Sequence, residues 1–169
     1  MDLADTTAVA KNLLQCLFSQ WTVIVNEVPV TQSHEYYNYR AYLETLLTYS
    51  TDAASSHLSN SYCYFDTWDM QPSDPTAETH TSATNDGFVA RWYMLRGSRD
   101  VQLLGRLYTD LCNDPLFLLP RIHLQIKLTK ARPCCYLMNK SADTRNTSKF
   151  LDAYLMVRRV QPNPAILEA

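Results

Sequence analysis

The sequence predicts a mainly β protein, a β-sandwich with a few short inserted helices. Three segments, at 101–107, 122–128 and 150–160, alternate apolar and polar residues with a period of two, which is typical of strands. Only one segment, at 38–49, has a strong helical pattern. The chain has 169 residues, so we interpret residues 1–169 as a single domain.

The first elements follow from local signals. Residues 6–17 are predicted as a short helix with leucines on one side. Residues 18–26 are rich in aromatic and β-branched residues, which favours a strand. A tight reversal at Asn26 and Glu27 then leads to a short strand at 28–31. Pro29 cannot donate to a central ladder, so this strand is expected at a sheet edge.

The helix predicted at 38–49 has one apolar face, and we expect it on one face or edge of the sheet. Its leucines Leu43, Leu46 and Leu47 are predicted to be buried. Further helical turns are expected at 51–58 and around 88–95.

Residues 66–86 form a long acidic segment with five acidic residues, two prolines and no basic residue. Such a segment in a compact domain is either functional or disordered, and we expect a partly disordered surface loop. In the strands that follow, the residues predicted to be buried are Leu103, Leu124, Ile126 and Leu155. On the strand at 122–128, the alternate residues His123, Gln125 and Lys127 are expected to face outward.

Sequence motifs for catalysis are absent: there is no phosphate-binding loop, no HExxH and no GxSxG. The four histidines are far apart, at His34, His57, His80 and His123. We therefore assign no catalytic residue, no cofactor-binding residue and no metal ligand, and we expect a protein that is not an enzyme and has no cofactor.

The cysteine count is odd and has no framework spacing, which favours reduced thiols inside the cell. The vicinal Cys134 and Cys135 would alternate across a strand. No stretch approaches the roughly 18 apolar residues that cross a bilayer, and no secretory signal is recognisable, so we expect an intracellular protein, in the cytoplasm or nucleus, without membrane contact.

Charge is unevenly distributed. Residues 1–88 hold two basic and eleven acidic residues, a net −9, and residues 89–169 hold thirteen basic and six acidic residues, a net +7. The two halves could pack against each other within one chain, or face neighbouring subunits. A nucleic-acid contact through the basic half, to which one of Arg158 and Arg159 could contribute, is a weaker alternative.

Tyrosines cluster at the start of the helix predicted at 38–49, at Tyr36, Tyr37, Tyr39 and Tyr42. They suit packing against the sheet with hydroxyls at the rim. They also suit a subunit interface, where tyrosine is enriched. Base stacking fits less well because the flanking residues are acidic.

Five segments, in this order and spacing, resemble a known family. They are LFSQWTVIVN (17–26), YNYRAYLETLLTYS (37–50), RDVQLLGRLYTDLCND (99–114), HLQIKLTKARPCCYLM (123–138) and SKFLDAYLMVRRVQPNPAIL (148–167). The chain resembles the major capsid protein of Polinton/Maverick elements and the related adintoviruses. The resemblance covers about residues 13 to 167, and YRAYLETLL and LLGRL are its most specific parts.

The resemblance implies a double jelly-roll fold that builds trimeric capsomers of an icosahedral shell, so a virion location and a homotrimer with neighbouring capsomers as partners are expected. It also implies that this chain is a partial first jelly roll, with the remainder of the double roll as a missing partner. The alternative is a host protein derived from such an element, acting as a protein- or nucleic-acid-binding module.

Two turns depart from the family pattern. Asn26-Glu27 stands where the family has Asn-Gly, and Leu119-Pro120-Arg121 stands where it has Leu-Asn-Gly. Glycine reaches positive φ without steric cost, whereas glutamate and arginine do not.

Overall fold

The computed structural model describes residues 6–31, 36–67, 70, 72–77, 84–139 and 146–161. Its strands are β1 (Ala8–Val9), β2 (Phe18–Val25), β3 (Val28–Pro29), β4 (Leu124–Lys130) and β5 (Leu137–Met138). Its α-helices are α1 (Leu13–Cys16), α2 (Tyr37–Thr48), α3 (Thr51–Ser55), α4 (Asp86–Leu95) and α5 (Asp110–Asn113), with 3-10 turns η1 (His57–Ser61) and η2 (Pro133–Cys135). The described part therefore mixes helices with antiparallel strands, and its β content is lower than predicted.

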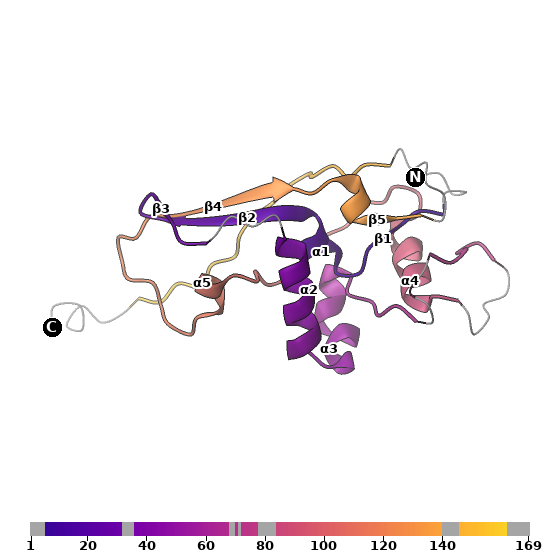
Figure 1. The fold of residues 1–169 in the computed structure, drawn as a ribbon, viewed down its shortest axis with the longest axis horizontal. Coiled ribbons are helices and arrows are strands. Elements are labelled where there is room, and N and C mark those ends of the chain that lie inside the picture. The colour runs from indigo at the N-terminus through magenta and orange to yellow at the C-terminus, as the bar shows by residue number, and fades with distance from the viewer. Residues whose placement is uncertain are drawn as a thin grey trace.

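The larger sheet has the strand order β3-β2-β4, and both pairings are antiparallel. Trp21 lies opposite Leu128, and Val23 opposite Ile126, with a register shift between Phe18 and Gln20. The strand predicted at 18–26 is confirmed, and the strand predicted at 122–128 is present two residues further along the chain. Figure 1 shows α2 and α3 projecting from one face of this sheet, while α4 lies beside β1 at the other end.

The reversal between β2 and β3 is a two-residue turn in which both residues have positive φ, 47° at Asn26 and 68° at Glu27. The Asn26 N–H donates to the carbonyl of His123, and the Asn26 side-chain oxygen accepts from the His123 N–H, both at 2.9 Å. β3 carries Pro29 and lies at an edge of the sheet, as predicted.

The helix α2 confirms the predicted segment but turns a different face inward. Tyr37, Ala41 and Thr45 are buried, whereas the exposed fractions of Leu43, Leu46 and Leu47 are 54%, 51% and 83%. The prediction that these leucines are buried is therefore wrong.

Hydrogen bonds and ring packing decide this orientation. The Tyr37 ring stacks on Trp21 at 5.2 Å, and its hydroxyl donates to Gln15 Oε1 at 2.5 Å. The Thr45 hydroxyl lies 2.9 Å from the Tyr108 hydroxyl. The small Ala41, fully buried between them along the helix, lets α2 approach β2 closely. Leucines on this face would leave these buried polar groups without partners.

Two of the three predicted alternating strands are not strands. Residues 101–107 and 151–160 have no regular secondary structure, and no strand in the described ranges pairs with them. Leu103 is half-buried, but Leu155 is 49% exposed, so its predicted burial is wrong. Period-two patterning indicates which residues suit a sheet, whereas a strand forms only where a partner strand is present.

On β4 the predicted orientation holds but the predicted burial does not. Residues Leu124, Ile126 and Leu128 lie opposite β2 residues of the inner face. Ile126 is half-buried, whereas Leu124 is 36% and Leu128 40% exposed. In the described residues β4, like β3, is an edge strand of this sheet. The side chains packed on the inner face centre on Trp21 and Val23 of β2, so they cover β4 only in part.

The helix predicted at 6–17 is instead a short strand followed by one helical turn. β1 pairs with β5, with Val9 opposite Leu137, and α1 begins only after Asn12, whose φ is 59°. An asparagine in the left-handed region interrupts a continuous helix at this point.

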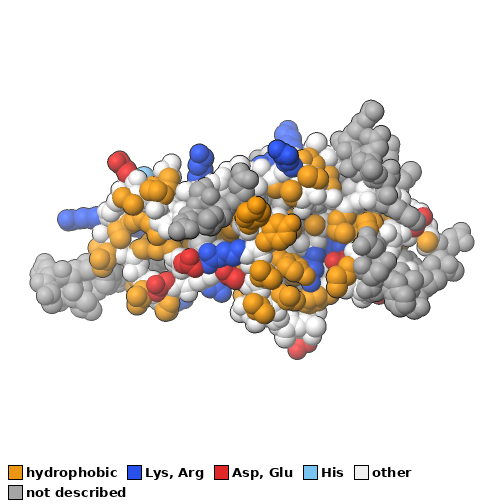
Figure 2. Space-filling model, in the orientation of Figure 1, with side chains coloured by type: hydrophobic (Ala, Val, Ile, Leu, Met, Phe, Trp, Pro, Cys, Tyr) orange, Lys and Arg blue, Asp and Glu red, His pale blue; other side chains and the backbone are white. Residues whose placement is uncertain are grey.

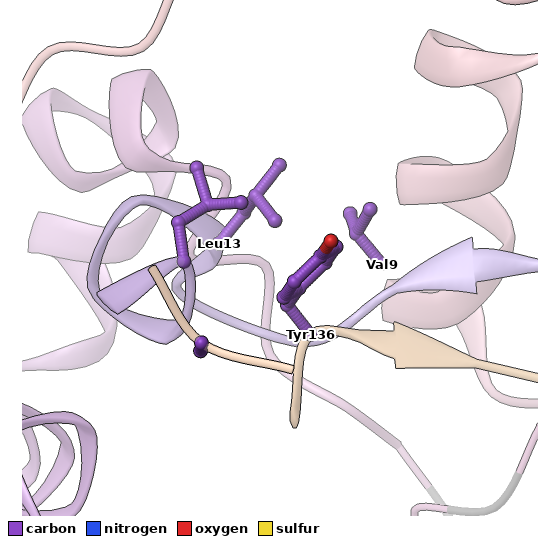
Figure 3. Packing of buried hydrophobic residues seen from close by; sticks show 5 residues of the cluster. Val9, Leu13 and Tyr136 are labelled. Carbon is purple, nitrogen blue, oxygen red and sulfur yellow. The ribbon is translucent and has the colours of Figure 1, made fainter. Parts of the chain in front are cut away.

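Two main clusters form the core. The first contains Val9, Leu13, Leu17, Ala131 and Tyr136, and Figure 3 shows the Tyr136 ring lying between Leu13 and Val9. The second contains Trp21, Val23, Tyr37, Ala41 and Tyr108 beneath β2. A smaller group of Ala8, Phe88 and Trp92 joins α4 to β1.

The helix predicted around 88–95 is confirmed as α4. Asn85 caps it, because its side chain accepts from the Phe88 N–H at 3.1 Å. The described parts of the acidic segment 66–86 that precede α4 have no regular secondary structure. Residues 68, 69, 71 and 78–83 lie outside the described residues, so the expected partial disorder stays a prediction.

Candidate interaction surface

A metal site finds no support in the described part of the chain. No group of three or more histidine, cysteine or acidic side chains there could hold a metal ion. His57 contacts the Tyr49 ring, and His123 lies at the hairpin end of the sheet. His34 and His80 lie outside the described residues.

A small pocket lies between α2, η1 and the residues that precede α1, and it is lined by Lys11, Tyr42, Leu46, Cys63 and Phe65 among others. The Lys11 ammonium lies 3.7 Å from the centre of the Phe65 ring. Burial lowers the pKa of Lys11 and raises the pKa of the Cys63 thiol. A buried, protonated thiol beside a lysine that packs on a ring provides no activated nucleophile.

Two further thiols, those of Cys16 and Cys135, are also disfavoured as thiolates. Burial, and to a smaller extent the nearby Cys135, raises the pKa of Cys16 to about 11. Cys134 and Cys135 are both exposed and end the 3-10 turn η2, so the predicted alternation across a strand is wrong. Burial, followed by the neighbouring Cys134, raises the pKa of Cys135.

Exposed apolar side chains are the most prominent surface feature. Large hydrophobic side chains are more often exposed than buried in the described ranges, and Figure 2 shows them gathered over α2 and around the loop after α5. Soluble monomers rarely expose large contiguous apolar patches, so these side chains are candidates for a contact surface. Three groups stand out: Tyr39, Leu43, Leu46 and Leu47 on α2; Leu116, Phe117, Leu118 and Leu119 after α5; and Leu151, Tyr154, Leu155, Met156 and Val157 near the C-terminus.

The four tyrosines at the start of α2 divide between packing in the core and exposure at a possible interface. Tyr37 packs in the core, and burial raises its pKa. Tyr36, Tyr39 and Tyr42 are exposed, and the rings of Tyr36 and Tyr39 pack edge to face at 6.2 Å. An exposed aromatic group beside the α2 leucines suits a protein interface better than a catalytic cleft.

Charged pairs link the acidic and basic halves of the chain. Arg91, fully buried, binds Asp66 at 2.6 Å between Nη2 and Oδ1. On the surface, Arg40 binds Asp110 in the other half of the chain and Glu44 in its own half, and its hydrogen bond to Asp110 lowers the pKa of that carboxyl. The Arg91 pair agrees with packing of one half against the other within a chain. Arg158 and Arg159 are both exposed.

No helix in the described residues is long and apolar enough to cross a bilayer. No protein-family model, curated protein or solved structure matches this chain. The fold and its exposed apolar surface are therefore the physical basis for a functional proposal.

Proposed function

We propose that this chain is a non-enzymatic structural protein that self-assembles: part of the first jelly roll of a double jelly-roll capsid protein of the Polinton/Maverick type. The observation that carries this proposal is the apolar surface that the chain leaves open along its sheet and along the segment 150–160. In a shell protein, such surface is covered by neighbouring strands and subunits.

The position of two irregular segments supports a sandwich. Leu107 and Tyr108 pack beneath β2, and Leu103 packs against the cluster around Leu13. The ring of Phe150 stacks on Phe18 at 5.7 Å. Leu107, Tyr108 and Phe150 therefore contact β2 as residues of a second layer would. The Gln102 amide donates to the Tyr154 hydroxyl at 3.0 Å between the two segments. A jelly roll has two such layers, each made of paired strands.

The exposure of these two segments points the same way. Most residues of 101–107 and all of 150–161 are exposed, among them Leu104, Leu151, Tyr154 and Val157. Additional strands or subunits would cover them.

The test is size-exclusion chromatography with light scattering on the purified chain at micromolar concentration. We expect oligomers or aggregates, and we expect co-expression of the remaining strands of a jelly roll to increase the soluble fraction. A sharp monomer peak with a cooperative thermal transition would show a self-sufficient domain and contradict the proposal.

A second readout separates an element gene from a host gene. The sequence of the flanking DNA is expected to encode a protein-primed polymerase, an integrase or a packaging ATPase. Their absence, together with a stable complex between the chain and a host protein, would favour the derived binding module instead.

A further inference from the structure

The strand β4 offers an open edge. It pairs with β2 along one side, and within the described ranges no strand pairs with its other side. Its inner face carries Leu124, Ile126 and Leu128, which the second layer covers only in part. Its outer face carries Gln125, Lys127 and Thr129, of which Lys127 is the one charge. An added strand would pair the backbone N–H and C=O groups along this edge of β4 and would bury Leu124 and Leu128.

A segment of the same sequence has the complementary pattern. Residues 150–157 place Leu151, Ala153, Leu155 and Val157 on one side and the acidic Asp152 on the other. Leu151 is 67% and Val157 64% exposed. Within its own chain, this segment contacts Phe18 and Gln102, and the Phe150 ring also lies 5.3 Å from the Lys130 ammonium at the end of β4. In the described residues it does not pair with β4 as a strand.

We propose that the open edge of β4 binds residues 150–157 of a second copy of this chain, as an added antiparallel strand. In the proposed register, Asp152 of one copy lies opposite Lys127 of the other, on the outer face. The inner face then pairs apolar residues only: Leu151 with Leu128, Ala153 with Ile126, Leu155 with Leu124 and Val157 with Ile122.

Neighbouring registers are poorer. A shift by one residue moves the leucines of the added strand to the polar face. A shift by two residues keeps the leucines inward but places Asp152 opposite Thr129 or Gln125, without an ion pair. Repulsion between like charges limits the length of the paired region. Lys149 would face Lys130 at one end, and Arg158 would face Arg121 at the other.

This inference rests on the proposed self-assembly and specifies one contact within it. The test is sedimentation velocity on the purified chain and on the variants Lys127→Glu, Asp152→Lys and their combination. Each single variant places like charges opposite each other, and we expect about five- to tenfold weaker self-association. The combination restores the pair with exchanged signs and is expected to return to within about twofold of the original affinity. Arg159→Glu, a charge reversal outside the register, is the matched control.

A second measurement identifies the copy that supplies the strand. Zero-length carbodiimide cross-linking of a mixture of isotope-labelled and unlabelled chains should give a Lys127–Asp152 linked peptide of mixed label. Circular dichroism and thermal unfolding of each variant show whether it remains folded.

The outcomes are distinct. A chain that remains monomeric contradicts both this inference and the proposed function. Self-association that is unaffected by the single variants, or a linked peptide without mixed label, contradicts the proposed strand addition at the β4 edge. Either result leaves the proposed function standing. Single variants that remain folded and weaken association without rescue by the combination also contradict the register.

Discussion

The guanidinium of Arg91 lies wholly inside the protein and is bound by the carboxylate of Asp66, with 2.6 Å between Nη2 and Oδ1. Its Nε donates to the carbonyl of Val9, and its Nη1 donates to the carbonyl of Tyr64, both at 2.8 Å. One side chain thereby joins α4 to β1 and to the start of the acidic segment. Such a charge is tolerated in a protein interior because it is paired and hydrogen-bonded.

Replacement of Arg91 should strongly destabilise the fold. In Arg91→Ala, the Asp66 carboxylate and two backbone carbonyls lose their partner, so we expect a loss of about 3–5 kcal/mol in the free energy of unfolding. Arg99→Ala, at an exposed position, is the control and should change stability by less than about 0.5 kcal/mol. Denaturant unfolding followed by fluorescence measures both, and similar losses would show that the Arg91 contacts are not structurally important.

A side chain at Gly87 in α4 should destabilise the fold. A Cβ at this position would lie 2.2 Å from the carbonyl oxygen of Phe65, which is backbone and cannot simply rotate away. At Gly105 the closest atom to a Cβ would be the side-chain Cδ2 of Leu14, at 2.6 Å, which can change rotamer. We therefore expect Gly87→Ala to cost about 1–3 kcal/mol and Gly105→Ala distinctly less, measured by thermal unfolding. The reverse order would contradict the close approach of α4 to Phe65.

Local signals predicted several elements correctly. The strand β2, the edge position of Pro29 and the helix α2 follow from β-branched content, a missing donor and helical periodicity. These signals act over a few residues, so they remain visible in a single sequence. The buried face of α2 was not predictable in this way, because Tyr37 and Thr45 are buried through hydrogen bonds to residues distant in the sequence.

The interaction surface was predictable only in part. The period-two pattern of 150–160 marked residues suited to a sheet, but it did not reveal that no other described segment pairs with them. The role of Arg91 carried no sequence signal, since its partners come from two segments distant in the sequence, at Val9 and at Tyr64 to Asp66. Pairings between distant segments are properties of the folded chain, and periodicity does not encode them.

The turn at Asn26 and Glu27 offers a stabilising substitution. Glu27 has a φ of 68°, which costs a residue with a Cβ roughly 1–2 kcal/mol and costs glycine little. Since glycine also loses more entropy on folding, we expect Glu27→Gly to raise the free energy of unfolding by about 0.5–1 kcal/mol. Glu27→Ala keeps the strain and is the control. Equal stability of the glycine and alanine variants would show that the turn is not strained at this position.

The two faces of α2 should respond differently to truncation. Leu46 is about half exposed, so Leu46→Ala should cost less than about 1 kcal/mol, below the 2–5 kcal/mol typical of a buried leucine. Tyr37→Phe removes the donor to Gln15 Oε1 and should cost about 1–3 kcal/mol although it deletes one atom. Chemical denaturation of both variants, at concentrations where self-association is negligible, gives the comparison. A larger loss for Leu46→Ala would mean that the leucine face is buried in the folded monomer.

Stability should fall at alkaline pH, and Cys16 should account for part of the fall. The thiol is neutral when protonated, and burial raises its pKa from 9.0 to about 11 in the folded chain. Below pH 9 the folded and unfolded chains both keep the proton, and this contribution to stability is fully present. Between about pH 9 and pH 11 the Cys16 thiol ionises in the unfolded chain but not in the folded chain, so the free energy of unfolding decreases as pH rises.

Cys16→Ala removes this titration, and the free energy of unfolding of the variant should fall less steeply across the interval, whatever its absolute stability. The other buried thiols and tyrosines titrate in both proteins, so the difference in slope isolates Cys16. Parallel pH profiles for the two proteins would show that the Cys16 thiol is equally accessible to ionisation in the folded and unfolded chains.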